Sequence, residues 1–165
     1  MFFLCYNICG DIMKSIEEKV VELLKKQKLK ISFAESCTGG MLVSNIVNVS
    51  GSSSVLSESY VTYSNEAKIK ILGVNKDTID RYTVYSSEVA LEMATGLKKI
   101  TKAEIAVSVT GEAENELNSC KCYYTIISND KTLNENVTFS GKRNEVRKLQ
   151  TKHILERIFF VLSQY

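Results

Sequence analysis

The sequence contains no proline and no tryptophan, and it contains a single histidine, His153. Without proline there is no Pro-rich spacer of the kind that separates domains. One histidine is too few for the usual Cys/His zinc sets. A Ser–His–Asp triad would depend on His153, which lies among charged neighbours in the last predicted helix. We therefore predict a surface position for His153, and a serine nucleophile would need a different base.

An excess of one charge and long apolar runs are also lacking. The chain has 21 Lys and Arg residues against 19 Asp and Glu, for a net charge of +2. This balance provides neither a basic footprint for nucleic acid nor a polybasic membrane anchor. No segment approaches the roughly 20 apolar residues that a membrane span needs. We expect no nucleic-acid partner and no membrane partner.

The cysteines form no regular set. A secreted disulfide scaffold normally carries an even number of cysteines, whereas this chain has five. Free thiols in a reducing cytosol are the simpler explanation, so we predict a cytoplasmic protein. The Cys-x-Cys pair is too short for the usual zinc spacing, and we expect no metal site. The cysteines are Cys5, Cys9, Cys37, Cys120 and Cys122.

The opening segment MFFLCYNICGD is apolar, but it has neither a basic leading region nor a small-residue cleavage pattern. It is therefore a poor signal peptide. Met13 begins MKSIEEKVVELLKK, which resembles a natural start. We predict that residues 1–12 are an extension outside the fold, either a disordered tail or an upstream start read in error. Residues 13–165 are expected to form one domain around one core.

Periodicity predicts helices interleaved with strands. Ser15 and Glu18 have the spacing of a capping box before a helix over 15–27. Asn65 is a candidate cap for a short helix. Together the order favours an α/β fold, a single-domain layered α/β/α sandwich with a mixed, mostly parallel central sheet. The other helices are predicted over 39–49, 66–73, 76–82, 88–100 and 143–162, and the strands over 29–34, 57–64, 104–110, 122–128 and 135–140.

The stretch KISFAESCTGG, residues 30–40, runs from an apolar strand into polar residues and two glycines. Backbone N–H groups at a helix N-terminus attract anions, and Gly39 and Gly40 let a ligand approach the backbone. Ser36 is therefore a candidate nucleophile beside an oxyanion or phosphate site. The simpler alternative is that Ser36 or Thr38 only caps the helix.

Lys68 is the candidate base for such a serine. A lysine can replace histidine when burial or positive potential lowers its pKa. Lys68 falls near the start of the helix predicted after Asn65, where the helix dipole disfavours a cation. Tyr63 precedes it at the end of a strand and is placed to share a proton with it. The alternative is a solvated lysine on a polar helix face.

Three further segments are candidates for ligand contact. GSSS (51–54) offers loop hydroxyls, and VTG (109–111) ends a strand at a glycine, as binding turns of α/β sheets often do. Arg143 and Arg147 lie four residues apart near a helix N-terminus, in a position that suits a phosphate or a carboxylate. Serine-rich loops and exposed helix arginines are also common without any ligand.

Several of these segments occur together in one known family. AESCTGG, GSS, VTYSNEAK…LGV, SSEVALEMATG, VSVTG and FSGKRNEVR resemble, in order and spacing, the C-terminal domain of the competence/damage-inducible protein CinA. The resemblance covers about residues 15–163, and the family includes stand-alone nicotinamide-nucleotide amidases. It implies hydrolysis of the carboxamide of nicotinamide mononucleotide to nicotinic acid mononucleotide and ammonia. It also implies a homo-oligomer, commonly a dimer, that needs no metal.

The resemblance implies a role for individual residues. Lys68, with Tyr63, would activate a serine for attack on the amide carbon, and water would hydrolyse the acyl-enzyme. Ser53 is favoured as the nucleophile with Ser36 relaying the proton, and the reverse assignment is left open. The implied substrate contacts are Thr38, Gly39, Gly40, Thr110, Gly111, Arg143 and Arg147.

One loop departs from the family pattern. After VTG the relatives carry a glycine-rich loop resembling I-A-G-P-x-G-G, whereas this chain reads GEAENELNSCKCYYTII. Glycines let the backbone approach a ligand, while Glu112, Glu114 and Glu116 would repel a phosphate. Two alternatives follow: an amidase with a shifted substrate, and a CinA-like protein without catalytic activity.

Overall fold

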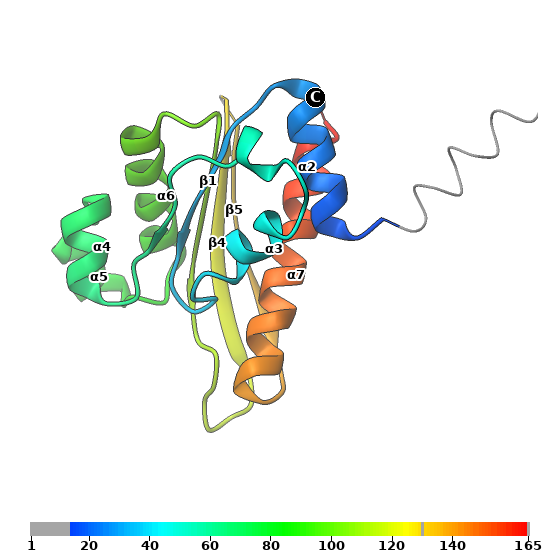
Figure 1. The fold of residues 1–165 in the computed structure, drawn as a ribbon. Helices are drawn as coiled ribbons and strands as arrows, with labels where there is room; N and C mark the ends of the chain where they lie inside the picture. Colours follow the sequence, from blue (N-terminus) through cyan, green and yellow to red (C-terminus); the bar gives the residue numbers. More distant parts are fainter. Residues whose placement is uncertain (1–13, 130, 165) are drawn as a thin grey trace, which may run out of the picture.

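A computed structural model describes residues 14–129 and 131–164, and the predicted extension over residues 1–12 lies outside them. One five-stranded sheet lies between two layers of helices (Figure 1). The predicted α/β/α arrangement is confirmed. The strands lie in the order β2-β1-β3-β4-β5. Their bounds are β1 Ile31–Glu35, β2 Tyr60–Val61, β3 Ile105–Gly111, β4 Cys120–Ser128 and β5 Lys131–Phe139.

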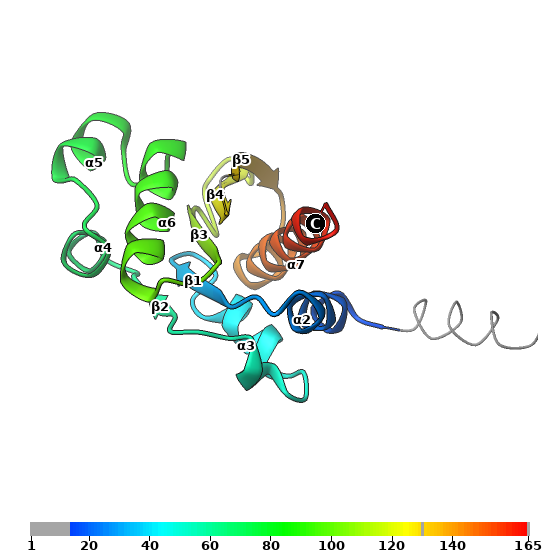
Figure 2. The same cartoon turned by 90° about the horizontal axis from the view of Figure 1, so that it is seen from above.

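The two helical layers bury separate apolar clusters on the two faces of the sheet. Figure 2 shows α2, α3 and α7 on one side and α4, α5 and α6 on the other. Phe33 and Val107 point into the first cluster, and Ala34 and Ala106 into the second. Since both faces are covered, β1 and β3 are buried along their whole length. The helices are α2 Ile16–Gln27, α3 Met41–Val47, α4 Asn65–Leu72, α5 Lys76–Tyr82, α6 Ser87–Thr101 and α7 Arg143–Leu162.

The sheet is mixed, as predicted, and all its strands except β4 run in the same direction. β1 pairs in parallel with β2 and β3, whereas β4 is antiparallel to both β3 and β5. β2 is shorter than predicted because it pairs with β1 only through Ala34 and Glu35. The three parallel strands end at the same edge of the sheet, which is where ligands bind in such folds.

Helix ends follow local signals with one correction. Ser15 and Glu18 form the predicted capping box of α2. The cap of α4 is Ser64 rather than Asn65, because the Ser64 hydroxyl accepts a hydrogen bond from the Ala67 N–H at 3.1 Å. No helix in the described part of the chain is long and apolar enough to cross a membrane.

α4 and α6 approach each other closely at Gly96. A Cβ added to Gly96 would lie 1.8 Å from the carbonyl oxygen of Leu72, the last residue of α4. No side chain fits between backbones at that distance. Gly96 therefore sets how closely α4 packs on the rest of the molecule.

The surface position predicted for His153 is wrong. Its ring is half-buried and makes edge contacts with Tyr124 and Phe139, at centroid distances of 5.5 and 5.9 Å. Its Nε2 lies 3.0 Å from the Tyr124 hydroxyl, which donates to Glu135. The adjacent Lys152 is exposed, and the charged residues around His153 in the sequence gave no sign of this aromatic contact.

We expect the free energy of unfolding to fall as the pH drops below about 6.5, the usual pKa of histidine. Burial lowers the pKa of His153 in the folded protein. The unfolded chain then binds the proton more readily, so this contribution is present above the unfolded pKa and is lost as the pH falls. Urea unfolding at pH 7.5 and 5.5 measures the effect, and His153→Phe should show a smaller drop. Equal drops in the two proteins would contradict this role of His153.

Candidate functional site

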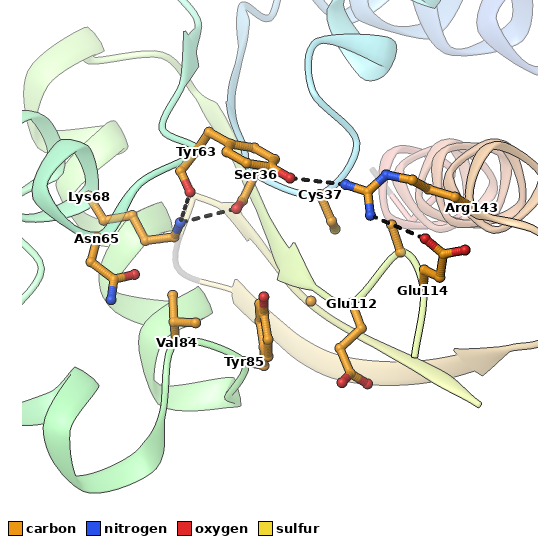
Figure 3. A pocket seen from close by; sticks show the side chains of 12 residues that line it. Ser36, Cys37, Tyr63, Asn65, Lys68, Val84, Tyr85, Glu112, Glu114 and Arg143 are labelled. Atoms are coloured by element: carbon orange, nitrogen blue, oxygen red, sulfur yellow. Dashed lines mark hydrogen bonds and ion pairs between the residues drawn. The ribbon is translucent and has the colours of Figure 1, made fainter. Parts of the chain in front are cut away.

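A cavity of about 190 Å³ opens at the carboxyl-terminal edge of the parallel strands. Ser36 and Cys37 follow β1, Tyr63 follows β2, and Gly111 ends β3. α4, the segment before α6, the loop after β3 and the start of α7 complete the wall. Figure 3 shows Lys68 at one end of this cavity and Arg143 at the other.

Ser36 and Lys68 meet inside the cavity. Lys68 Nζ lies 3.0 Å from Ser36 Oγ, and the two residues are only 1% and 5% exposed, respectively. The same nitrogen donates to the carbonyl oxygens of Thr62 at 2.8 Å and Tyr63 at 3.3 Å. The alternative of a solvated lysine is therefore wrong. Three oxygens surround the amine, and no carboxylate pairs with it among the described residues.

Burial controls the protonation of Lys68. Loss of water lowers the pKa of Lys68 to about 8, against a smaller opposing effect of the nearby Cys37 thiol. Lys68 is the fourth residue of α4, where the helix dipole also disfavours a cation. A neutral amine is thus accessible near pH 8. The neutral amine donates its two N–H groups to the carbonyl oxygens of Thr62 and Tyr63. Its lone pair is therefore available to accept the proton of Ser36.

Glu35, which was not among the predicted site residues, fixes the turn that presents Ser36. Its fully buried carboxylate accepts hydrogen bonds from the Thr38 hydroxyl at 2.6 Å and from the N–H groups of Gly40, Leu42 and Val43 at 2.9, 3.1 and 2.9 Å. The anion site expected at the start of α3 is therefore filled by the chain itself. The residue at the N-cap is Gly40, so neither Ser36 nor Thr38 caps α3. An acidic residue just before a helix start was the available signal.

Arg147 holds the same turn from outside. Its Nε donates to the Cys37 carbonyl at 3.0 Å and its Nη2 to the Thr38 carbonyl at 2.8 Å. A Cβ on Gly39 would lie 3.0 Å from Arg147 Nη2, so the guanidinium packs directly on the glycine. Contrary to the prediction of substrate contacts, Thr38, Gly39, Gly40 and Arg147 do not line the cavity.

Of the VTG segment, only Gly111 lines the cavity. Thr110 is fully buried and donates to the Val84 carbonyl at 2.9 Å, so it positions the wall segment that contains Val84 and Tyr85. Figure 3 shows Val84 and Tyr85 across the cavity from Ser36. No motif pointed to Val84 or Tyr85, because tertiary contacts alone bring them to the site.

Ser53 lies away from the cavity, so its predicted role as nucleophile is not supported. Its loop sits beside the first residues of β1: Ser54 O accepts from Lys30 Nζ at 2.6 Å, and Val55 O accepts from the Ile31 N–H at 2.8 Å. Ser36 follows the last residue of β1. The two serines are therefore at opposite ends of a strand whose five residues span roughly 16 Å.

Arg143, a predicted substrate contact, stands at the mouth of the cavity. Its Nη2 donates to the Tyr63 hydroxyl at 3.1 Å, and its Nη1 lies 3.9 Å from a carboxylate oxygen of Glu114. The Tyr63 hydroxyl thus contacts Arg143 and not Lys68, which Tyr63 reaches only through its backbone carbonyl. Within residues 14–129 and 131–164, no group of three or more His, Cys, Asp and Glu side chains could hold a metal ion.

Comparison with known proteins gives one consistent result. A model of the CinA C-terminal domain family matches residues 13–162. A putative competence-damage inducible protein of Alkaliphilus oremlandii is 44% identical over 155 residues, which are 91% of this chain and 38% of the relative. A CinA-like protein of Petrotoga mobilis is 42% identical over 143 residues, which are 84% and 36% of the two chains. This chain therefore spans less than two fifths of the length of these curated relatives.

Solved structures share the fold. The competence/damage-inducible protein of Agrobacterium tumefaciens is 30% identical with a TM-score of 0.79, over 90% of this chain and 95% of that one. A CinA superfamily protein of Klebsiella pneumoniae is 22% identical with a TM-score of 0.84, over 91% and 97% of the two chains. At that identity the second likeness concerns the fold alone.

Proposed function

Because the chain belongs to the CinA C-terminal domain family, we propose that it hydrolyses the carboxamide of nicotinamide mononucleotide, with Ser36 as nucleophile and Lys68 as base. The observation that carries the proposal is the 3.0 Å contact between Lys68 Nζ and Ser36 Oγ at the cavity wall. A nucleophile within hydrogen-bond reach of a base held by further groups is the recurring arrangement of covalent hydrolases.

The proposed reaction needs no further acid or base. Neutral Lys68 accepts the Ser36 proton as Oγ attacks the amide carbon, while Thr62 and Tyr63 hold the other two N–H bonds of the amine. The resulting ammonium gives its proton to the departing nitrogen, and ammonia leaves an ester on Ser36. Lys68 then deprotonates a water molecule that hydrolyses the ester, which releases the carboxylic acid and restores the hydroxyl.

We propose the backbone N–H of Cys37 as the donor to the developing oxyanion. Cys37 directly follows Ser36 and lines the cavity. Its N–H makes no hydrogen bond within the described part of the chain, whereas the Ser36 N–H donates to Val109 and the Gly39 N–H to Ser36. The amide after a nucleophilic serine serves this purpose in other hydrolases.

The size of the cavity supports a substrate that enters only in part. Its volume of about 190 Å³ is below the roughly 300–1,000 Å³ of common ligand pockets. It suits the pyridine carboxamide, with the ribose and phosphate extending past the mouth. Arg143 lies there, at the end of the cavity away from Lys68 (Figure 3). A phosphate is a preferred partner of an arginine fork.

We expect Ser36→Ala to lower the release of ammonia from nicotinamide mononucleotide by about a thousandfold or more, since no other hydroxyl in the cavity contacts the lysine among the described residues. Ser53→Ala is the matched control and should keep the activity. Ammonia is measured with a coupled enzymatic assay. The opposite result, loss in Ser53→Ala only, would return the nucleophile to Ser53.

A shifted substrate is the second candidate, because Glu112 and Glu114 line the cavity together with Arg143. Under that alternative the protein would hydrolyse a carboxamide without a phosphate, such as nicotinamide riboside, and leave the mononucleotide intact. The same ammonia assay separates the two candidates. Release from neither compound would favour the alternative without catalytic activity.

A further inference from the structure

The cation at the mouth of the cavity already has an anionic partner. Arg143 is the first residue of α7 and its side chain is half exposed. A Glu114 carboxylate oxygen lies 3.9 Å from its Nη1, and the Tyr63 hydroxyl accepts a hydrogen bond from its Nη2. Figure 3 shows Glu114 beside the guanidinium at the end of the cavity away from Lys68. A substrate phosphate that binds Arg143 would therefore lie close to the negative charge of Glu114.

The two glutamates of the wall differ in their partners. Glu112 Oε2 accepts a hydrogen bond from Asn115 Nδ2 at 2.9 Å and lies 3.5 Å from the Lys121 N–H, so its charge is partly satisfied by the loop. Glu114 has Arg143 as its one partner among the described residues. Lys68 is engaged with Ser36 in the interior. The mouth therefore has one cation and two carboxylates, and Glu114 is the carboxylate that faces the cation.

The loop that carries Glu114 is held in place. The Asn115 side chain donates a hydrogen bond to the Ser119 carbonyl at 2.8 Å and accepts one from the Ser119 N–H at 3.0 Å. Asn118 Oδ1 accepts from the Gly141 N–H at 2.7 Å, just before α7, and Gln150 of α7 donates to the Glu112 carbonyl at 2.7 Å. These contacts join the loop over residues 112–119 to the helix that carries Arg143. Glu114 is thus held near Arg143 by contacts that do not involve its own side chain.

We propose that Glu114 determines substrate specificity by competing for Arg143 and repelling a doubly charged phosphate. This inference rests on the proposed function, because it concerns the substrate of the same site. A phosphate monoester must displace Glu114 from the guanidinium and then remain within a few ångströms of its charge. A carboxamide without a phosphate meets neither obstacle. Glu114 thereby lowers the affinity of the site for a mononucleotide relative to the same amide without its phosphate.

Calorimetric titration of the full chain carrying Ser36→Ala, which prevents turnover, tests this proposal with nicotinamide mononucleotide and nicotinamide riboside as probes. In that background Glu114→Gln should bind the mononucleotide about threefold to tenfold more tightly than the chain that keeps Glu114, because the pair is solvent-exposed. Its affinity for the riboside, a pyridinium cation without a phosphate, should not rise. Glu116→Gln is the matched control, since Glu116 is an exposed glutamate of the same loop that does not line the cavity. The gain should shrink at 0.5 M salt, where screening is stronger.

Equal affinities of the Glu114→Gln and Glu116→Gln variants for the mononucleotide would overturn the proposal, as would an equal gain for the riboside. Failure of the proposed function is a separate outcome, because binding is measured without turnover. If neither pyridine compound binds, inorganic phosphate replaces them as the probe. Glu114→Gln should then bind phosphate more tightly than Glu116→Gln, and the absence of a difference would again reject the role of Glu114.

Discussion

Lys68→Met is expected to abolish amide hydrolysis, with kcat lower by about a thousandfold or more, while the chain still folds. Methionine fills the volume of the lysine stem but offers no base to Ser36. Folding should survive because the change removes a buried amine that has no carboxylate partner among the described residues. Ammonia release and circular dichroism measure the two properties. Lys70→Met, an exposed position of the same helix, is the matched control.

The pH profile tells a catalytic Lys68 from a structural one. Because the pKa of Lys68 is lowered to about 8, kcat/KM of the unchanged protein should rise with pH through that value as the amine loses its proton. Residual activity of Lys68→Met should lack this inflection, and Lys70→Met should retain it. An unfolded variant, or the same inflection in Lys68→Met, would contradict the assignment of Lys68 as the base.

Gly96→Ala is expected to destabilise the fold by about 2 kcal/mol or more, although alanine is the better helix former. The added Cβ would lie 1.8 Å from the Leu72 carbonyl oxygen, and backbone cannot move aside as a side chain does. Because Leu72 lies one turn beyond Lys68 in α4, the shift should also move the amine away from Ser36 and lower activity. Urea unfolding and ammonia release measure the two effects.

Gly73→Ala provides the comparison for Gly96. A Cβ there meets nothing within 4 Å, but the backbone has φ +70°, so the cost should be about 1 kcal/mol from conformation alone. If Gly96→Ala is as stable as the unchanged protein, the close approach of the two helices does not constrain the fold.

Local signals in the sequence were sufficient for much of the fold. The capping box at Ser15 and the apolar periodicity of residues 143–162 gave two helices with nearly the observed bounds. The antiparallel pairing of β4 with β3 and β5 could also be predicted from the sequence. Only two residues separate β4 from β5 and eight separate β3 from β4, and connections that short cannot carry a parallel crossover.

Site residues were predictable only where a side chain of suitable chemistry also occupies a recognisable position in a strand, turn or helix. Ser36, Gly111 and Arg143 stand at element ends and Lys68 is the fourth residue of α4, and the structure brings them to one cavity. Glu35 was missed because its one signal, an acidic residue before a helix start, does not reveal that the carboxylate is buried against N–H groups. Ser53 was misplaced because its loop gave no sign of which end of β1 it would join.

The two members of the proposed dyad belong to different layers of the sandwich. The Ser36 turn is tied to α7 by Arg147, whereas Lys68 belongs to α4, on the other face of the sheet (Figure 2). Neither layer holds a reactive serine by itself, since the proton acceptor arrives with the opposite layer. Ser36 therefore has its proposed base only when both helical layers are docked on the sheet, and a nascent or half-denatured molecule carries only an ordinary hydroxyl.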